Sequence, residues 1–176
     1  MEPLSPSYIY KRASTDGIIM GACFIGFFSC SMLSSSSLIL SLLGFVLMCT
    51  PPFLLYFLLR RSHVSVGGRL SYGQLWIEGT LTMVLGSVFL AIVTFIYLRW
   101  VNPTFLADQI TASVEILDKL GPDYEPLSEA MNTMLADGEL PSAVQVAGSL
   151  IQSAFLTGAV VAAIVAAIVR AVKVKS

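Results

Sequence analysis

The sequence is poor in charge. Lys, Arg, Asp and Glu together make up only 12% of the 176 residues, whereas hydrophobic residues make up 56%. Average soluble domains carry about 25% charged residues, so this chain has too few to cover a water-exposed globule. No basic cluster is long enough to suggest nucleic acid as a partner. The composition therefore predicts a protein surrounded by lipid.

Residue types that carry catalysis and metal binding are scarce. There is one histidine, His63, and the cysteines Cys23, Cys30 and Cys49 have neither a CxxC neighbour nor a nearby histidine. We expect the cysteines to be small buried apolar residues and His63 to lie solvated in a short loop. The chain contains no GxSxG, HExxH or P-loop pattern. We therefore predict no enzymatic activity and no catalytic, metal-binding or cofactor-binding residues.

Four apolar runs are long enough to cross a membrane. A transmembrane helix needs roughly 20 mostly apolar residues, and a segment surrounded by lipid must satisfy its backbone polar groups internally. We predict an all-α membrane protein, a four-helix transmembrane bundle that forms one integral membrane domain over residues 1–176. The predicted spans are residues 17–33, 38–59, 75–98 and 148–169.

The first run also has one property of a targeting signal, because Lys11 and Arg12 precede it. It is longer than the apolar region of a signal peptide, and no A-x-A-like cleavage site follows. The segment from Phe27 to Cys30 resembles a lipoprotein cleavage site only weakly, since Phe occupies a position that usually holds an aliphatic residue. We expect an uncleaved signal anchor.

Two tryptophans mark the ends of the third run. Trp76 and Trp100 are 24 residues apart, which is about 36 Å along a helix. Both indoles can therefore reach the interfacial layers of a bilayer, where Trp is enriched. Ser71 and Gln74 have the spacing of a capping box just before this helix.

The basic residues are distributed unevenly between the connecting segments. Eight of the ten lie on one side of a four-pass topology, whereas residues 101–143 contain one lysine and eight acids. Positively charged loops stay in the cytoplasm, which predicts two cytoplasmic termini and an extracytoplasmic 101–143 segment. The eight bases are Lys11, Arg12, Arg60, Arg61, Arg69, Arg170, Lys173 and Lys175.

Pro51 and Pro52 lie within the second predicted span. Each proline lacks a backbone N–H and clashes with the carbonyl four residues earlier, which frees the carbonyls of Leu47 and Met48. The structural interpretation is a kinked helix. The functional alternative is a hinge or an opened polar pocket, as in transporters with broken helices, although only one span is interrupted and no matching half-repeat occurs.

A row of small residues recurs at four-residue spacing along the fourth run. Such a face lets a neighbouring backbone approach closely. It predicts packing within the bundle or, alternatively, an interface with another membrane protein or a second copy of this chain. The residues are Ala154, Gly158, Ala162 and Ala166, and Gly17 with Gly21 is a shorter version in the first run.

Asp16 and Glu78 are the two ionisable residues that lie in or beside the spans. An ionised side chain costs roughly 2.5–3.5 kcal/mol at the centre of a transmembrane helix, but both residues lie near the predicted cytoplasmic boundary. Arg60, Arg61 and Arg69 share that depth, so we expect an interfacial ion pair. The alternative is a proton relay or an ion-binding site.

The acidic segment 101–143 has the pattern of two short amphipathic helices. The first runs from an N-cap at Asn102 to the Gly-Pro pair at 121–122, and the second from after Pro126 to the Asp-Gly pair at 137–138. We expect their acids to face outward and their apolar faces to lie on the bundle or the membrane surface. Eight acids spread over two helices predict a solvated face rather than a cation site or a catalytic carboxylate pair.

Several short motifs follow one another along the chain: Tyr10-Lys11 leading into DGII at 16–19, GRLSYG at 68–73, WVNPTFL at 100–106, and a small-residue last helix ending in bases. Together they resemble a bacterial family of small four-helix membrane proteins, the domain-of-unknown-function family number 4199. The resemblance covers nearly the whole chain and implies a multi-pass inner-membrane protein with no assigned activity or functional residues. The prolines at 51–52 and the serine-rich turn at 34–37 depart from the pattern expected of that family.

Three functions are compatible with these patterns. We expect a non-enzymatic accessory or interaction subunit of a membrane complex, because no catalytic constellation is present while small-residue faces and a helical cap are. A small transporter or channel with a proline-broken second helix is the alternative. An intramembrane enzyme comes third, since Asp16 and Glu78 are its only candidate residues.

Overall fold

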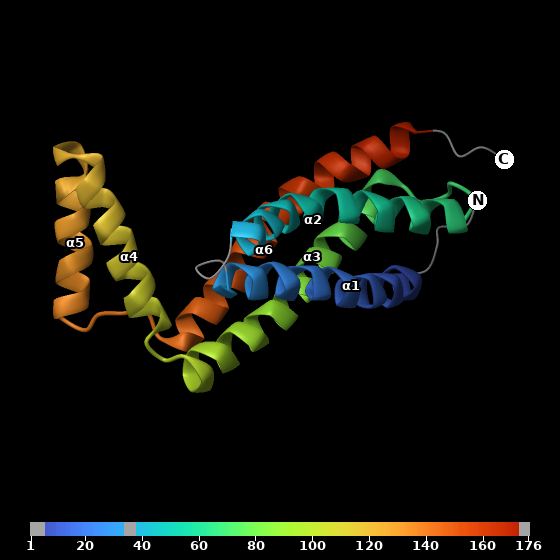
Figure 1. Cartoon of the computed structure of the whole chain (residues 1–176). Coiled ribbons are helices and arrows are strands. Elements are labelled where there is room, and N and C mark those ends of the chain that lie inside the picture. Colours follow the sequence, from blue (N-terminus) through green and yellow to red (C-terminus); the bar gives the residue numbers. More distant parts are fainter. Residues whose placement is uncertain (1–5, 34–37, 173–176) are drawn as a thin grey trace. The chain divides into compact units, whose positions relative to one another are not determined.

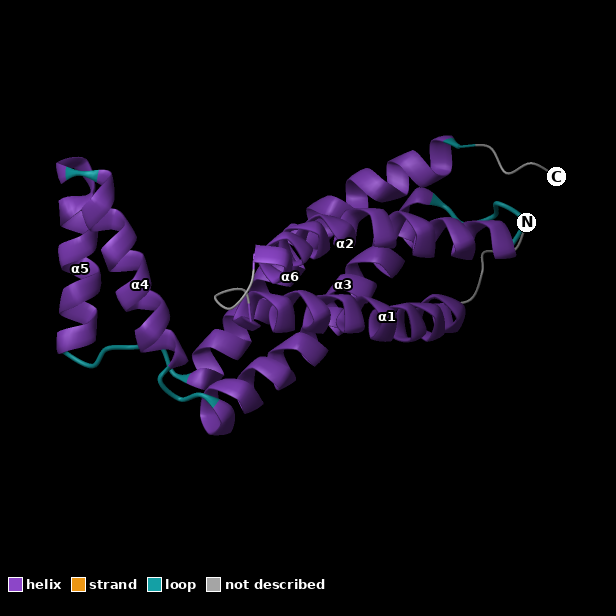
Figure 2. Cartoon of the chain, in the orientation of Figure 1, coloured by secondary structure: helices purple, strands orange, loops and turns teal. Residues whose placement is uncertain are grey.

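The computed structural model describes residues 6–33 and 38–172, and every regular element in these two ranges is a helix (Figures 1 and 2). This confirms the predicted all-α class. The serine-rich turn at 34–37 lies outside the described residues. The elements are α1 (Pro6–Leu33), α2 (Leu38–Ser65), α3 (Tyr72–Ile96), the π-helical turn η2 (Tyr97–Val101), α4 (Phe105–Leu120), the 3₁₀ turn η3 (Pro122–Tyr124), α5 (Glu125–Ala136) and α6 (Ala143–Ala171).

Four helices are long and apolar enough to cross a membrane, as the apolar runs predict. The qualifying segments are Ser7–Met32, Leu42–Ser65, Tyr72–Val101 and Ala143–Ala171. The helices extend beyond the predicted spans, most of all at the start of α1 and the end of α2. Hydropathy alone places the end of a predicted span at the first charged residue. A helix can nevertheless continue through charged residues when neighbouring side chains form ion pairs or hydrogen bonds with them.

The chain divides into two compact units, which are described separately. The first comprises Met1–Ile92 and Gly148–Ser176, and therefore contains α1, α2 and most of α3 and α6. Its core includes Met20 from α1, Leu55 and Leu59 from α2, Leu75 from α3 and Val169 from α6, each at most 1% exposed. The second unit comprises Val93–Ala147.

Glycines allow α1 and α3 to approach closely. A Cβ atom added at Gly86 of α3 would lie 2.9 Å from Met20 Cγ and 3.1 Å from the backbone nitrogen of Gly21 on α1. A Cβ added at Gly17 would lie 2.8 Å from Leu85 Cβ. The Gly17–Gly21 face in α1 is thus the surface that contacts α3, as expected for a small-residue face.

The small-residue face of α6 packs against α3 in the same way. Gly158, Ala162 and Ala166 are buried. A Cβ added at Gly158 would lie 2.9 Å from Met83 Cβ, and one added at Gly79 would lie 2.9 Å from Ala162 Cβ. Of the two interpretations of this face, the structure therefore favours packing within the chain.

Capping boxes begin both α3 and α6. Ser71 N donates to Gln74 Oε1 over 2.9 Å and Gln74 N donates to Ser71 Oγ over 3.3 Å, which confirms the predicted box. Ser142 and Gln145 form the same reciprocal pair before α6, at 2.7 and 3.3 Å. The sequence analysis did not identify this second box, although Ser142-x-x-Gln145 has the same spacing.

The second unit contains a π-helical turn and a pair of packed helices. Asn102 does not cap α4 as predicted: its N–H closes η2 by donating to Tyr97 O over 2.8 Å, and Thr104 is the residue before α4. Thr104 Oγ1 bonds to Asn102 Oδ1 and to Asp108 Oδ2. The Asn side chain therefore supports the start of α4 from one turn outside it.

The cysteines are free, and their burial differs from the prediction. Cys23 and Cys30 are half-buried, whereas Cys49 is exposed on α2. The expectation of buried packing residues was therefore wrong for Cys49. A surface that faces lipid can expose apolar and weakly polar residues alike, so an apolar run does not indicate burial.

Candidate functional site

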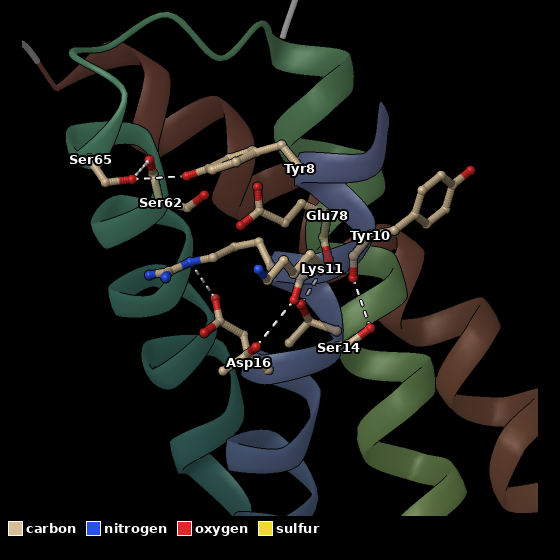
Figure 3. A network of polar contacts seen from close by, with 11 residues as sticks. Tyr8, Tyr10, Lys11, Ser14, Asp16, Ser62, Ser65 and Glu78 are labelled. Carbon is tan, nitrogen blue, oxygen red and sulfur yellow. Dashed lines mark hydrogen bonds and ion pairs between the residues drawn. The ribbon is translucent and has the colours of Figure 1, made fainter. Parts of the chain in front are cut away.

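Polar side chains gather at one end of the first unit (Figure 3). Two contacts fasten this end: the hydroxyl oxygens of Tyr8 on α1 and Ser65 on α2 lie 3.0 Å apart, and Arg60 Nη1 donates to Val172 O, just after α6, over 2.6 Å. We define the polar cluster as Asp16, Ser62 and Glu78 (Figure 3), together with Arg12 and Arg61, whose charges act on Asp16, and the buried His63, which follows Ser62 in α2.

Asp16 forms an ion pair within α1. Its carboxylate Oδ2 lies 3.5 Å from Nε of Arg12, and the two side chains are 2% and 21% exposed. Arg61, on α2, is close enough for its charge to act on the same carboxylate. The sequence analysis expected an ion pair with bases after the second span and missed Arg12. The four-residue spacing from Arg12 to Asp16 was the available signal.

Glu78 is the most buried acid of the cluster. The residue is 0% exposed, as is Ser62. Among the described residues, neither carboxylate oxygen of Glu78 has a hydrogen-bond partner, and the Ser62 hydroxyl also has none. Ser62, Asp16 and Arg12 are near enough to interact with the carboxylate, but Ser62 falls short of hydrogen-bond geometry. Burying a polar group without a partner is costly, so Glu78 is the strongest candidate functional residue.

The prediction that His63 lies solvated in a loop is wrong. His63 belongs to α2, which continues to Ser65, and only 5% of the residue is exposed. Arg60 and Arg170 are near enough for their charges to act on the imidazole. Its Nδ1 atom has no hydrogen bond to the described part of the chain. The helix extends past the apolar run because residues from α1 and α6 cover its polar end.

The chemistry of the polar cluster is limited. Within residues 6–33 and 38–172, no three His, Cys, Asp or Glu side chains come together in a way that could hold a metal ion. Two acids, Asp16 and Glu78, face two bases, Arg12 and Arg61, so the cluster lacks the excess negative charge that would attract a cation. It can exchange a proton at a buried carboxyl group, or it can hold the helix ends together through polar contacts.

A second feature of the first unit is a cavity of about 480 Å³ beside Pro51 and Pro52. α2 is helical on both sides of the proline pair, so the prolines do not end it. Leu47 and Met48, whose carbonyls the prolines leave without their usual donors, are among the lining residues. The others are Phe24, Phe27, Met83, Ser87, Leu90, Leu150, Ala154, Thr157 and Val161.

The cavity wall offers few polar groups. Its two hydroxyl residues are Ser87 and Thr157, and both hydroxyls donate to carbonyls of their own helices, to Val84 O and Ser153 O, each over 2.7 Å. A water molecule in a buried site needs two to four polar partners. The cavity is thus suited to an apolar occupant and differs from the polar pocket expected for the transporter alternative.

In residues 6–33 and 38–172 every regular element is a helix, and four of these helices are long and apolar enough to cross a membrane, so the class is a multi-pass helical membrane protein. The chain belongs to the family described as "Protein of unknown function (DUF4199)", whose model matches residues 15–171. This match confirms the family resemblance derived from the motifs, and it includes Asp16, Glu78 and the cavity residues. No curated protein and no solved structure matches the chain.

Proposed function

We propose that this protein is a non-enzymatic accessory or interaction subunit of a membrane complex in the bacterial cytoplasmic membrane. The docking element is the hairpin of α4 and α5. The partner is a membrane protein with an apolar surface and a basic rim. The observation that carries the proposal is that the hairpin lies in a compact unit of its own and exposes large apolar side chains.

The exposed side chains of the hairpin are large. Ile116 and Leu120 lie one turn apart on α4 and are 59% and 60% exposed, and Leu127 on α5 is 52% exposed. Tyr124 and Met134 are 45% and 40% exposed. Exposed apolar patches rimmed by polar residues mark interaction sites on soluble surfaces.

Internal contacts of the hairpin leave this apolar surface available. Val114 of α4 is buried, and Ser128 Oγ on α5 donates to Asp118 Oδ1 on α4. The Ser128–Asp118 bond joins α4 to α5 and does not involve the exposed residues Ile116, Leu120 and Leu127. The hairpin therefore holds its exposed apolar residues on a scaffold with its own packing.

Charge indicates the chemistry of the partner. Residues 101–143 carry eight acids and one lysine, so a basic rim on the partner would be electrostatically complementary. The positive-inside rule supports an extracytoplasmic hairpin and two cytoplasmic termini. The Tyr8–Ser65 and Arg60–Val172 contacts are compatible with this topology, because they bring the start of α1 and the end of α6 to the same end of α2.

Site-specific photo-crosslinking in native membranes tests the proposal. A photoreactive phenylalanine at Leu127 should crosslink to one defined membrane protein through a segment rich in Lys and Arg. The exposed residue Ile92 of α3 is the matched control position and should give lipid adducts. Reversing two exposed charges with Asp123→Lys and Glu125→Lys should lower the crosslinked yield by about tenfold or more, since like charges at an interface repel strongly.

The proposal fails if the probe at Leu127 labels only lipid. It also fails if the probe labels a variable mixture of water-soluble proteins. It also fails if the charge-reversed variant crosslinks as well as the parent while circular dichroism shows the same helix content. A protein that migrates alone and monomeric from native membranes would contradict it independently.

A small transporter or channel is the second candidate, and the cavity beside Pro51 and Pro52 is the observation that favours it. The apolar wall argues against passage of ions and favours an apolar solute. Purified protein in vesicles should then show flux that falls when both prolines become alanine. Absence of flux across a panel of ions, amino acids and apolar compounds would rule out this candidate.

An intramembrane enzyme is the third candidate, with Asp16 and Glu78 as its only acids in the spans. Both acids belong to the polar cluster, which contributes one hydroxyl group, that of Ser62, and one imidazole, that of His63. Any activity found with the purified protein should disappear in Asp16→Asn and Glu78→Gln variants. Activity that survives both substitutions would eliminate this assignment.

A further inference from the structure

An apolar groove runs between α2 and α6 on the surface of the first unit. It encloses about 540 Å³ and includes Phe53, which is 67% exposed, and Ile164, which is 58% exposed. Pro52 and Val161 line both this groove and the proline cavity. The groove therefore lies at the surface of the unit and adjoins the proline cavity at these two residues.

Basic residues lie at one end of the groove. Tyr56 and Ile168 are lining residues, and one helical turn beyond them Arg60 Nη1 donates to Val172 O over 2.6 Å. Arg170 is exposed, and both Arg60 and Arg170 are near enough to act on His63. The groove thus leads from two arginines toward the apolar cavity.

The distance along α6 matches one leaflet of a bilayer. Val161, where groove and cavity meet, precedes Arg170 by nine residues, or about 14 Å at 1.5 Å per residue. The hydrocarbon core of a bilayer is about 30 Å thick. With Arg170 at the membrane surface, the groove spans one leaflet and the cavity lies near the midplane.

We propose that the α2–α6 groove binds one anionic phospholipid. The phosphate pairs with Arg60 and Arg170, one acyl chain lies along the groove, and its end enters the cavity beside Pro52. Basic pockets between transmembrane helices bind anionic headgroups by this chemistry. This inference is independent of the proposed interaction function, because it concerns the first unit alone.

Charge favours a lipid over a second copy of this chain as the occupant. Eight of the eleven acids lie in residues 101–143, which precede α6, whereas Arg170 lies in the last turn of that helix. Asp16 is already paired with Arg12, and Glu78 is fully buried. The small-residue face of α6 is also occupied by α3. Among the described residues of the first unit, a second copy therefore offers no accessible carboxylate to the two arginines.

Native mass spectrometry of the full chain tests the proposal by titration with phosphatidylglycerol or phosphatidylcholine of identical acyl chains. We expect one phosphatidylglycerol to be retained in preference to phosphatidylcholine. Arg170→Gln should weaken its binding about fivefold, the effect of one base at a membrane surface. Arg69→Gln, an exposed base in the α2–α3 turn, is the charge-matched control and should bind as the parent does.

The groove itself is tested by filling it. Ile164→Trp should abolish the tightly bound lipid, whereas Ile92→Trp, at an exposed site on α3, should not. Equal retention of both lipids, or equal loss in Arg69→Gln and Arg170→Gln, would show general surface attraction and overturn the proposal. A dimer that lipid does not displace and that Ile164→Trp dissolves would assign the groove to a second copy, which also overturns it.

Discussion

Substituting alanine for Gly86 tests the close packing of α3 against α1. The polar cluster and the proline cavity both contain residues from these two helices. The new Cβ would lie 2.9 Å from Met20 Cγ and 3.1 Å from Gly21 N. Met20 is fully buried and Cγ is only two bonds from its backbone, while Gly21 N is itself a backbone atom, so neither atom can move away easily. Overpacking of this kind costs about 1–3 kcal/mol, while replacing a helical glycine with alanine returns up to about 1 kcal/mol.

We therefore expect Gly86→Ala to lower the free energy of unfolding by about 0–2 kcal/mol, and by about 1–3 kcal/mol relative to a glycine-to-alanine change without the overpacking. Gly73, on the same helix, is the matched control, because a Cβ there would meet no atom within 4 Å. Gly73→Ala should leave stability unchanged or raise it. Steric trapping in bicelles measures both values with the membrane-like environment retained. Equal stabilities of the two variants would refute the close contact between α1 and α3.

Three further substitutions test individual contacts. Arg12→Gln should lower the free energy of unfolding by about 1–3 kcal/mol, because it leaves the buried Asp16 carboxylate without its ion-pair partner. Adding Asp16→Asn should restore most of the lost stability. Additive losses in a double-mutant cycle would contradict the ion pair. Trp76→Phe should cost about 1 kcal/mol through loss of the 2.9 Å bond from Nε1 to Ala159 O. Trp100→Phe, at a 66% exposed residue, should cost less, and equal effects would argue against the bond. Ser128→Ala should lower the thermal stability of the hairpin modestly by removing its bond to Asp118, and unchanged melting would show that the bond is not stabilising.

The sequence predicts the four long helices because their signal is local. About 20 consecutive apolar residues suffice to identify a membrane span, and the Ser71–Gln74 pair lies within one turn of the helix that it caps. The ends of α2 were not predictable in this way. Hydropathy predicts a loop from Arg60 to Ser65. The helix continues through these residues because Tyr8 of α1 and Val172, just after α6, make hydrogen bonds with Ser65 and Arg60.

The polar cluster and the cavity depend on which helix faces meet. Asp16 and Glu78 are identifiable as acids near a membrane boundary, but their burial follows from contacts between different helices. Pro51 and Pro52 predict an irregularity in α2 without predicting an apolar cavity lined by residues from the other long helices. A single sequence contains no direct record of such contacts.

The proposed topology is multi-pass, with the hairpin outside the cytoplasm. Membrane-impermeant maleimide labelling of intact cells tests it directly. The protein would carry alanine at the three native cysteines and one new cysteine, at Glu129 in α5 or at Arg69 in the α2–α3 turn. We predict labelling at Glu129→Cys in intact cells and at Arg69→Cys only after permeabilisation. Labelling of Arg69→Cys in intact cells, with Glu129→Cys protected until lysis, would contradict the account.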